Sequence, residues 1–123
     1  MTTIVLWADR FEECRDYYRT LLSATISDES VDFVNVSGAN GSVLLHRVPE
    51  EWASDTSQPA EVREENPIKP VFEVASIAQV RGALAESSGR LFDATREQTY
   101  GDTTYCDGVD PDGNVVQAFQ KAK

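Results

Sequence analysis

One order of elements occurs twice in this chain: an apolar strand, an amphipathic helix and three further strands. When the sequence is shifted by 66 residues against itself, the first strand and helix fall on the second, and their apolar faces coincide. The aligned pairs are Val5 with Val71, Leu6 with Phe72, Phe11 with Ile77, Cys14 with Val80, Arg15 with Arg81 and Tyr18 with Leu84. Only two of these pairs are identities, and two unrelated strand–helix units could align as well by chance. The repeated order favours two βαβββ modules and therefore an α+β fold.

The first module is predicted within about residues 1–48. A β-branched and aromatic run at 3–8 predicts a buried strand, and apolar residues at three- and four-residue spacing predict a helix that begins at Phe11. Asp9 and Glu12 have the spacing of a capping box for this helix. Three strands are expected at 24–26, 31–36 and 42–48. The turn at 38–41, whose residues tolerate positive φ, would join the last two as a hairpin.

An acidic connector separates the modules at residues 49–67. Its lack of periodicity and its many carboxylates predict a solvated segment that is mobile or lies over a site. The second module is expected at about 68–123, with a helix from Ile77 that is capped by Ser76 and Gln79 and stopped at Gly89. Its strands are predicted at 68–75, 91–92, 103–109 and 115–120. A chain of 123 residues is long enough to bury one core, so both modules should form a single domain.

Charge and cysteine content limit the partners and the compartment. With 21 acidic and 11 basic residues, the net charge is -10, which opposes approach to nucleic acid or an anionic membrane. No apolar run approaches the roughly 20 residues that span a bilayer, and the apolar start of the chain lacks the basic flank of a signal peptide. Cys14 and Cys106 lie far apart and have no metal-binding spacing. These features predict a cytoplasmic protein with reduced thiols.

Two segments give the chain a resemblance to a known superfamily. Residues 17–22, Tyr-Tyr-Arg-Thr-Leu-Leu, end the first helix, and residues 110–114, Asp-Pro-Asp-Gly-Asn, precede the last strand. In the second segment Pro111 sets a turn φ, while Gly113 and Asn114 tolerate left-handed backbone. Both segments resemble those of the vicinal oxygen chelate superfamily, which includes glyoxalase I, extradiol dioxygenases and bleomycin-resistance proteins. The resemblance implies two βαβββ modules whose sheets curl round a cleft, usually completed by a homodimer.

The resemblance also implies where a metal would be bound. Superfamily members that do chemistry hold a metal at the base of the cleft, and the ligand positions here are Thr3 (or Thr2), His46, Lys69 and Gln117, the last where glutamate is usual. A catalytic divalent ion needs about three anionic or imidazole ligands, and this set offers only one. The ammonium group of Lys69 would also repel the cation. No metal or other cofactor is therefore expected, metal-dependent chemistry is disfavoured, and no catalytic residue is assigned.

Alternation along the strands predicts a pocket. Trp7, Glu73, Gln117 and Phe119 would line an aromatic-walled site with a few polar groups, which suits a small molecule. For Phe119 in particular, simple core packing is the alternative. Glu73 interrupts an apolar strand and should face the cleft with Lys69, either as a ligand contact or as an ion pair with Lys69.

Three further residues have alternative roles. His46, the only histidine, is either a binding or general-base residue or a half-buried packing residue. Tyr105 or Asp107 could join the rim, depending on the parity of their strand. The predicted ligand-binding residues are Trp7, His46, Lys69, Glu73, Gln117 and Phe119.

Two functions follow from these predictions. The first is metal-independent binding or sequestration of a small cationic or aromatic molecule by a homodimer, with charge complementarity from Glu73. The second is a glyoxalase-like lyase, isomerase or dioxygenase that uses His46 and Glu73 as acid and base or holds a metal in an unanticipated way. A structural protein that docks through residues 49–67 is a third class.

Overall fold

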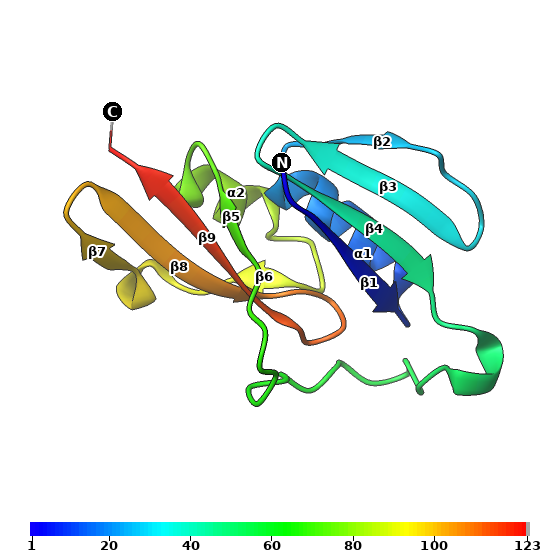
Figure 1. The fold of residues 1–123 in the computed structure, drawn as a ribbon. Helices are drawn as coiled ribbons and strands as arrows, with labels where there is room; N and C mark the ends of the chain where they lie inside the picture. Colours follow the sequence, from blue (N-terminus) through cyan, green and yellow to red (C-terminus); the bar gives the residue numbers. More distant parts are fainter. Residues whose placement is uncertain (123) are drawn as a thin grey trace.

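Each half of the chain forms a small mixed sheet with one helix packed against it (Figure 1). The structure is a computed structural model that describes residues 1–122. The first half contains β1 (Thr3–Ala8), α1 (Phe11–Leu21), β2 (Thr25–Ser27), β3 (Phe33–Gly38) and β4 (Gly41–Arg47). Its sheet has the order β1-β4-β3-β2, in which β1 and β4 are parallel and the other pairs are antiparallel.

The second half repeats this arrangement with one addition. It contains β5 (Val71–Glu73), α2 (Ile77–Ala83), β6 (Arg90–Leu91), β7 (Gln98–Tyr100), β8 (Thr103–Val109) and β9 (Val115–Lys121). The sheet order is β5-β9-β8-β6, and the unpredicted strand β7 pairs with the start of β8. Two short 3-10 helices, η1 (Glu50–Trp52) and η2 (Ala94–Arg96), lie outside the sheets. The predicted α+β fold of two βαβββ modules is confirmed.

The strand registers show which residues are equivalent in the two modules. The helices begin 66 residues apart, at Phe11 and Ile77, as the sequence shift predicts. Val5 lies opposite Leu44 in the β1–β4 pair, and its equivalent Val71 lies opposite Gln117 in the β5–β9 pair. The equivalent of Gln117 is therefore Leu44 and not His46.

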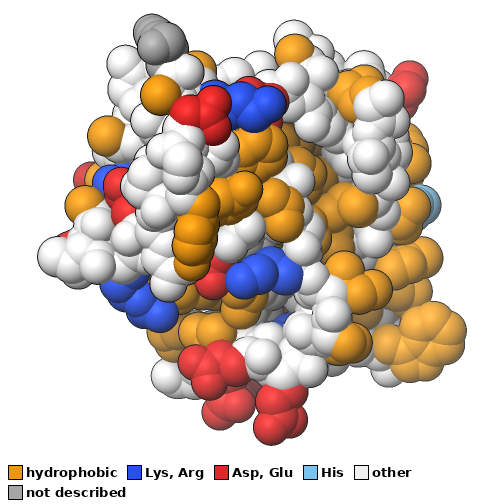
Figure 2. Space-filling view, turned by 60° about the vertical axis from the view of Figure 1, so that its left-hand side comes forward, with side chains coloured by type: hydrophobic (Ala, Val, Ile, Leu, Met, Phe, Trp, Pro, Cys, Tyr) orange, Lys and Arg blue, Asp and Glu red, His pale blue; other side chains and the backbone are white. Residues whose placement is uncertain are grey.

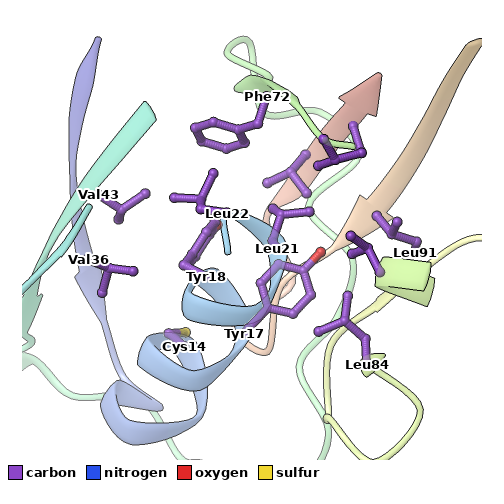
Figure 3. Packing of buried hydrophobic residues seen from close by; sticks show 14 of the residues in the cluster. Cys14, Tyr17, Tyr18, Leu21, Leu22, Val36, Val43, Phe72, Leu84 and Leu91 are labelled. Carbon is purple, nitrogen blue, oxygen red and sulfur yellow. The ribbon is translucent and has the colours of Figure 1, made fainter. Parts of the chain in front are cut away.

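One hydrophobic core joins both modules around α1. Tyr17 and Tyr18 of this helix are fully buried, and they pack between the two sheets. Figure 3 shows Val36 and Val43 approaching α1 from the first sheet and Leu91 approaching it from the second. Because side chains alternate along a strand, the remaining side chains of both sheets point away from this shared core.

The ends of the helices differ from the sequence predictions. The capping box at Asp9 and Glu12 is wrong, because the side chain of Asp9 accepts a hydrogen bond from the Ser54 N–H (3.0 Å) and no side chain of its own segment caps α1. The carboxylate of Asp112 takes this place and accepts the backbone N–H groups of Asp9 (2.8 Å) and Arg10 (3.1 Å). The cap at Ser76 is confirmed, since its Oγ accepts the N–H of residue 79 at 3.2 Å.

Glycine has different roles from those predicted at two places. Helix α2 ends at Ala83, and Gly89 is not its stop; a Cβ on Gly89 would lie 2.6 Å from the ring of Tyr17, so this position requires a close approach. The hairpin at 38–41 is confirmed, but its central residues Ala39 and Asn40 do not have positive φ. In the 110–114 turn, Gly113 does have positive φ, as this turn requires.

Both cysteines are free and buried, and burial raises the pKa of each thiol. Since the thiolate is the nucleophile, Cys14 and Cys106 should resist alkylation in the folded protein. We expect mass spectrometry after iodoacetamide treatment at pH 8 to find no adduct on the native chain and two adducts in denaturant. Rapid modification of the native chain would contradict this burial.

No helix within residues 1–122 is long and apolar enough to cross a membrane.

Candidate functional site

The outward side of the second sheet carries a polar cluster of Lys69, Asp107 and Gln117. Asp107 on β8 lies opposite Gln117 on β9, and the Gln117 side chain donates a hydrogen bond to Asp107 at 3.0 Å. The ammonium group of Lys69 lies 3.2 Å from the same carboxylate. The predicted ion pair between Lys69 and Glu73 is therefore wrong, and Asp107 takes the place of Glu73. The pair is about one-third to two-fifths exposed, so it contributes little to stability.

Two adjoining hollows open beside this cluster. One has a volume of about 380 Å³ and is lined by Gln98, Tyr105 and Gln117, together with four residues that it shares with the other hollow. The other, of about 430 Å³, extends toward the end of the connector and the residue after it, between Val62 and Ile68. Both hollows share the side chains of Lys69, Phe92, Arg96 and Asp107. Figure 2 looks toward this side of the molecule, where basic and acidic side chains lie among apolar ones around a recess.

Two aromatic rings, Phe92 and Tyr105, form part of the walls, whereas the predicted Phe119 lines neither hollow. Tyr105 lies opposite Phe119 across the β8–β9 pair with ring centroids 5.8 Å apart, which resolves the parity of β8 and puts Asp107 on the same face. Phe92 and Arg96 were not predicted. Phe92 directly follows β6 and Arg96 ends η2, and these elements are too short for periodicity to have indicated the orientation of either side chain.

The outward face of the first sheet carries a separate aromatic group. Trp7 stacks on His46 with ring centroids 4.6 Å apart, and Phe33 meets His46 edge-on at 5.1 Å. The Trp7 side chain is nevertheless 58% exposed, and Val5 beside it is 54% exposed. His46 is thus partly buried between two rings. Val5, Trp7 and Phe33 thus form an apolar group around the one histidine of this face.

One chain does not assemble the pocket that the sequence predicted. Trp7 and His46 lie on the first sheet, Gln117 and Phe119 lie on the second, and both outward faces point away from the shared core. Neither Trp7 nor His46 lines the hollows beside Lys69. In Figure 2 the pale blue of the single histidine is at the edge of the view.

The ligand positions that the superfamily would use do not suit a divalent metal here. Thr3 and His46 belong to the first sheet, whereas Gln117 belongs to the second and Lys69 precedes its strand β5, with its ammonium group 3.2 Å from the carboxylate of Asp107. Among residues 1–122, no three side chains of His, Cys, Asp or Glu gather as metal ligands. A neutral amide, a hydroxyl and a lysine are poor donors for such an ion.

The 110–114 turn, the more specific of the two resembling segments, has a structural role. Asp110 is buried, and its carboxylate accepts hydrogen bonds from the Tyr18 hydroxyl (2.6 Å), from the backbone N–H groups of Asp112 and Asn114 (2.9 Å each) and from the Asn114 side chain (2.9 Å). Burial raises the pKa of Asp110, while the hydrogen bonds from Tyr18 and Asn114 lower it. With Asp112 at the start of α1, the turn fastens the second module to the helix of the first.

The connector lies over this turn for part of its length. The N–H of Arg63 donates to the carbonyl of Gly113 at 2.8 Å, and a Cβ on Gly113 would lie 2.0 Å from the carbonyl oxygen of Glu61. Most connector side chains are exposed, as predicted. Its last residues, from Val62, form one wall of the larger hollow.

Comparison with known proteins identifies the architecture. No protein-family model matches the chain, and no curated protein sequence matches it. Solved structures do match: a glyoxalase/bleomycin resistance protein from Albidiferax ferrireducens T118 has a TM-score of 0.65 at 15% identity, over 98% of both chains. The chain has the glyoxalase/bleomycin-resistance fold. This confirms the fold to which the sequence resemblance pointed.

Two further structures with the glyoxalase/bleomycin-resistance fold align over nearly the full length. A bleomycin resistance determinant encoded on the transposon Tn5 has a TM-score of 0.62 at 14% identity, over 98% of this chain and 97% of that one. A glyoxalase/bleomycin resistance protein/dioxygenase family enzyme from Burkholderia phytofirmans PsJN has a TM-score of 0.62 at 12% identity, over 97% and 96%. At these identities the likeness establishes the shared fold, and the function must be argued from the site.

Proposed function

We propose that this protein binds a small molecule reversibly and without a metal, in the hollow beside Lys69, Asp107 and Gln117. The observation that carries the proposal is the ammonium group of Lys69, which lies 3.2 Å from Asp107 where metal-dependent superfamily members would have a ligand. Because the ammonium group of Lys69 supplies the positive charge that balances the carboxylate of Asp107, no metal is needed to do so. The lining of this hollow combines two aromatic rings, Phe92 and Tyr105, with polar side chains that can fix the orientation of a ligand.

We further propose that a second copy of the chain completes the site. The hollows are open on one side, and the Trp7 and Val5 side chains form an exposed apolar face on the other sheet of the same chain. Exposed apolar faces of this kind mark interaction surfaces. In a homodimer, Trp7 and His46 of one copy would cover the hollow of the other. The ligand would then lie between an aromatic stack and a polar cluster.

A cytoplasmic location belongs to the same proposal. It is favoured by the two free thiols of Cys14 and Cys106, because unpaired cysteines persist in reducing compartments.

Replacing Trp7 by alanine tests the ligand site and the second copy together. We expect a panel of cationic, anionic and neutral aromatic molecules, added to chelator-treated protein, to contain at least one member that shifts the amide resonances of Lys69, Asp107 and Gln117. Trp7→Ala should weaken that binding about tenfold or more, as loss of a central aromatic contact does. Nuclear magnetic resonance measures binding, and sedimentation measures the dimer.

Trp52 provides a matched control, because it is 75% exposed, lies in η1 and is absent from the hollows. Trp52→Ala should leave both binding and the dimer unchanged. A monomeric chain whose hollow responds to no compound would contradict the proposal. So would binding that disappears with the chelator and returns only with an added divalent metal.

A further inference from the structure

Basic side chains are concentrated in the larger hollow, although the chain as a whole is acidic. Of the 11 basic residues of the chain, four line this hollow, whereas only two of the 21 acidic residues do. The basic residues are Arg63, Lys69, Arg90 and Arg96, and the acidic ones are Glu64 and Asp107. The local charge is thus opposite in sign to the net charge of the protein.

The arginines of the hollow also differ from the other arginines in their partners. Five of the eight arginines, all outside this hollow, form salt bridges with carboxylates: Arg10, Arg15, Arg19, Arg47 and Arg81. Arg63, Arg90 and Arg96 form none within the described part of the chain. In a protein with twice as many acidic as basic residues, the arginines without a carboxylate partner all face one recess. The Nε of Arg63 donates to the carbonyl of Asp112 at 3.3 Å, whereas the guanidinium N–H groups of Arg90 and Arg96 make no hydrogen bond within residues 1–122 and are available to a ligand.

Phe92 holds two of these guanidinium groups in place. The guanidinium carbon of Arg96 lies 4.1 Å from the centre of the Phe92 ring, and that of Arg90 lies 5.3 Å from it. Contact with a ring face orients a guanidinium group while leaving its edge free to donate hydrogen bonds. Planar donors of this kind match a carboxylate or a phosphate through two parallel hydrogen bonds.

From these observations we propose that the hollow binds the anionic group, a carboxylate or a phosphate, of a small aromatic molecule. The anion would lie in the larger hollow between Arg90, Arg96 and Lys69, and the aromatic part would extend along β8 into the adjoining smaller hollow, toward Tyr105 and Gln117. This inference rests on the proposed binding function and specifies its ligand. It reverses the sign of the charge predicted from the sequence, where Glu73 suggested a cationic molecule; Glu73 does not line either hollow.

Four probes with one ring and different charges test this inference on the full chain. They are phenylacetate, phenyl phosphate, neutral 2-phenylacetamide and the phenethylammonium ion. Amide resonances of Phe92, Arg96 and Asp107 report binding during titration. We expect at least one anionic probe to bind about tenfold or more tightly than the neutral and cationic probes, because charge-assisted hydrogen bonds are the strong ones. Comparing phenylacetate with phenyl phosphate shows which anion the hollow prefers.

Arg96→Gln should weaken binding of the preferred anion about tenfold, since it removes one charged donor pair. Arg19→Gln is the control: it removes the same charge from α1, where Arg19 is 54% exposed and 3.8 Å from Asp16, and should change binding less than twofold. Melting curves verify that both variants fold. Equal losses in the two variants would overturn the inference, because a general charge effect would then explain the preference.

The remaining outcomes separate this inference from the proposed function. If the neutral or the cationic probe binds in the hollow as tightly as the anions, the anion inference is overturned and small-molecule binding is retained. If anions shift only resonances away from Phe92 and Arg96, the inference is likewise overturned. If no probe shifts any resonance of the hollow up to its solubility limit, the anion inference is overturned, whereas the proposed function is overturned only when the wider panel also fails to bind.

Discussion

Asp110→Ala is expected to reduce the free energy of unfolding by at least about 3 kcal/mol, because it leaves several buried donors without an acceptor. The Tyr18 hydroxyl, two backbone N–H groups and the Asn114 side chain all donate to the Asp110 carboxylate. Only 2% of Asp110 is exposed, so water has little access to replace the lost oxygen atoms. Each unsatisfied buried donor costs roughly 1–3 kcal/mol.

Urea unfolding followed by circular dichroism measures this loss, and thermal unfolding should show a decrease in Tm of about 10 °C. Asp102→Ala is a matched control, because Asp102 is exposed and accepts one side-chain hydrogen bond, from the Thr103 hydroxyl at 3.0 Å. It should change the stability by less than about 0.5 kcal/mol. Equal stabilities of the two variants would mean that the 110–114 turn does not fasten the modules together.

Tyr18 explains why the two resembling segments occur in the same chain. Its hydroxyl comes from the aromatic pair at the end of α1 and donates to Asp110 of the 110–114 turn, 92 residues away. The two sequence signals therefore belong to one buried contact between the modules. They identify the fold through its core, and they carry no information about which ligand an outward face binds.

The sequence predicted those parts of the fold that depend on local periodicity. Apolar spacing located both helices, and β-branched runs located β1, β3, β4, β8 and β9 within two residues at each end. Strand β5 is much shorter than predicted, since only Val71–Glu73 pair with β9. Strand β7 was missed because its three residues are polar or exposed and carry no apolar alternation.

The candidate site was only partly predictable, because it depends on contacts across strands. Alternation correctly predicted that the side chains of Gln117 and Phe119 face outward from the core. The partner of Lys69 depends on the register between β8 and β9, which brings Asp107 beside Gln117 and which no local pattern contains. No local pattern predicts the arrangement of the two sheets around α1 either, and it is this arrangement that separates Trp7 from Gln117.

A single added methyl group should have opposite effects at two glycines. At Gly108 on β8, a Cβ would lie 2.4 Å from the carbonyl oxygen of Arg90 and 2.7 Å from the side chain of Leu91. The nearest atom belongs to the backbone of β6 and has no free rotation by which to move away. We expect Gly108→Ala to reduce the free energy of unfolding by about 3 kcal/mol, the cost of overpacking a site that relaxes poorly.

Gly82 provides the control, because it lies within α2 and a Cβ there would meet nothing within 4 Å. Gly82→Ala should increase the free energy of unfolding by about 0.5–1 kcal/mol, the difference in helix propensity between the two residues. Urea unfolding measures both variants. A neutral Gly108→Ala would show that β6 moves freely relative to β8. Because β6 carries Arg90, such freedom would also remove the reason to expect this guanidinium group at a fixed place in the anion hollow.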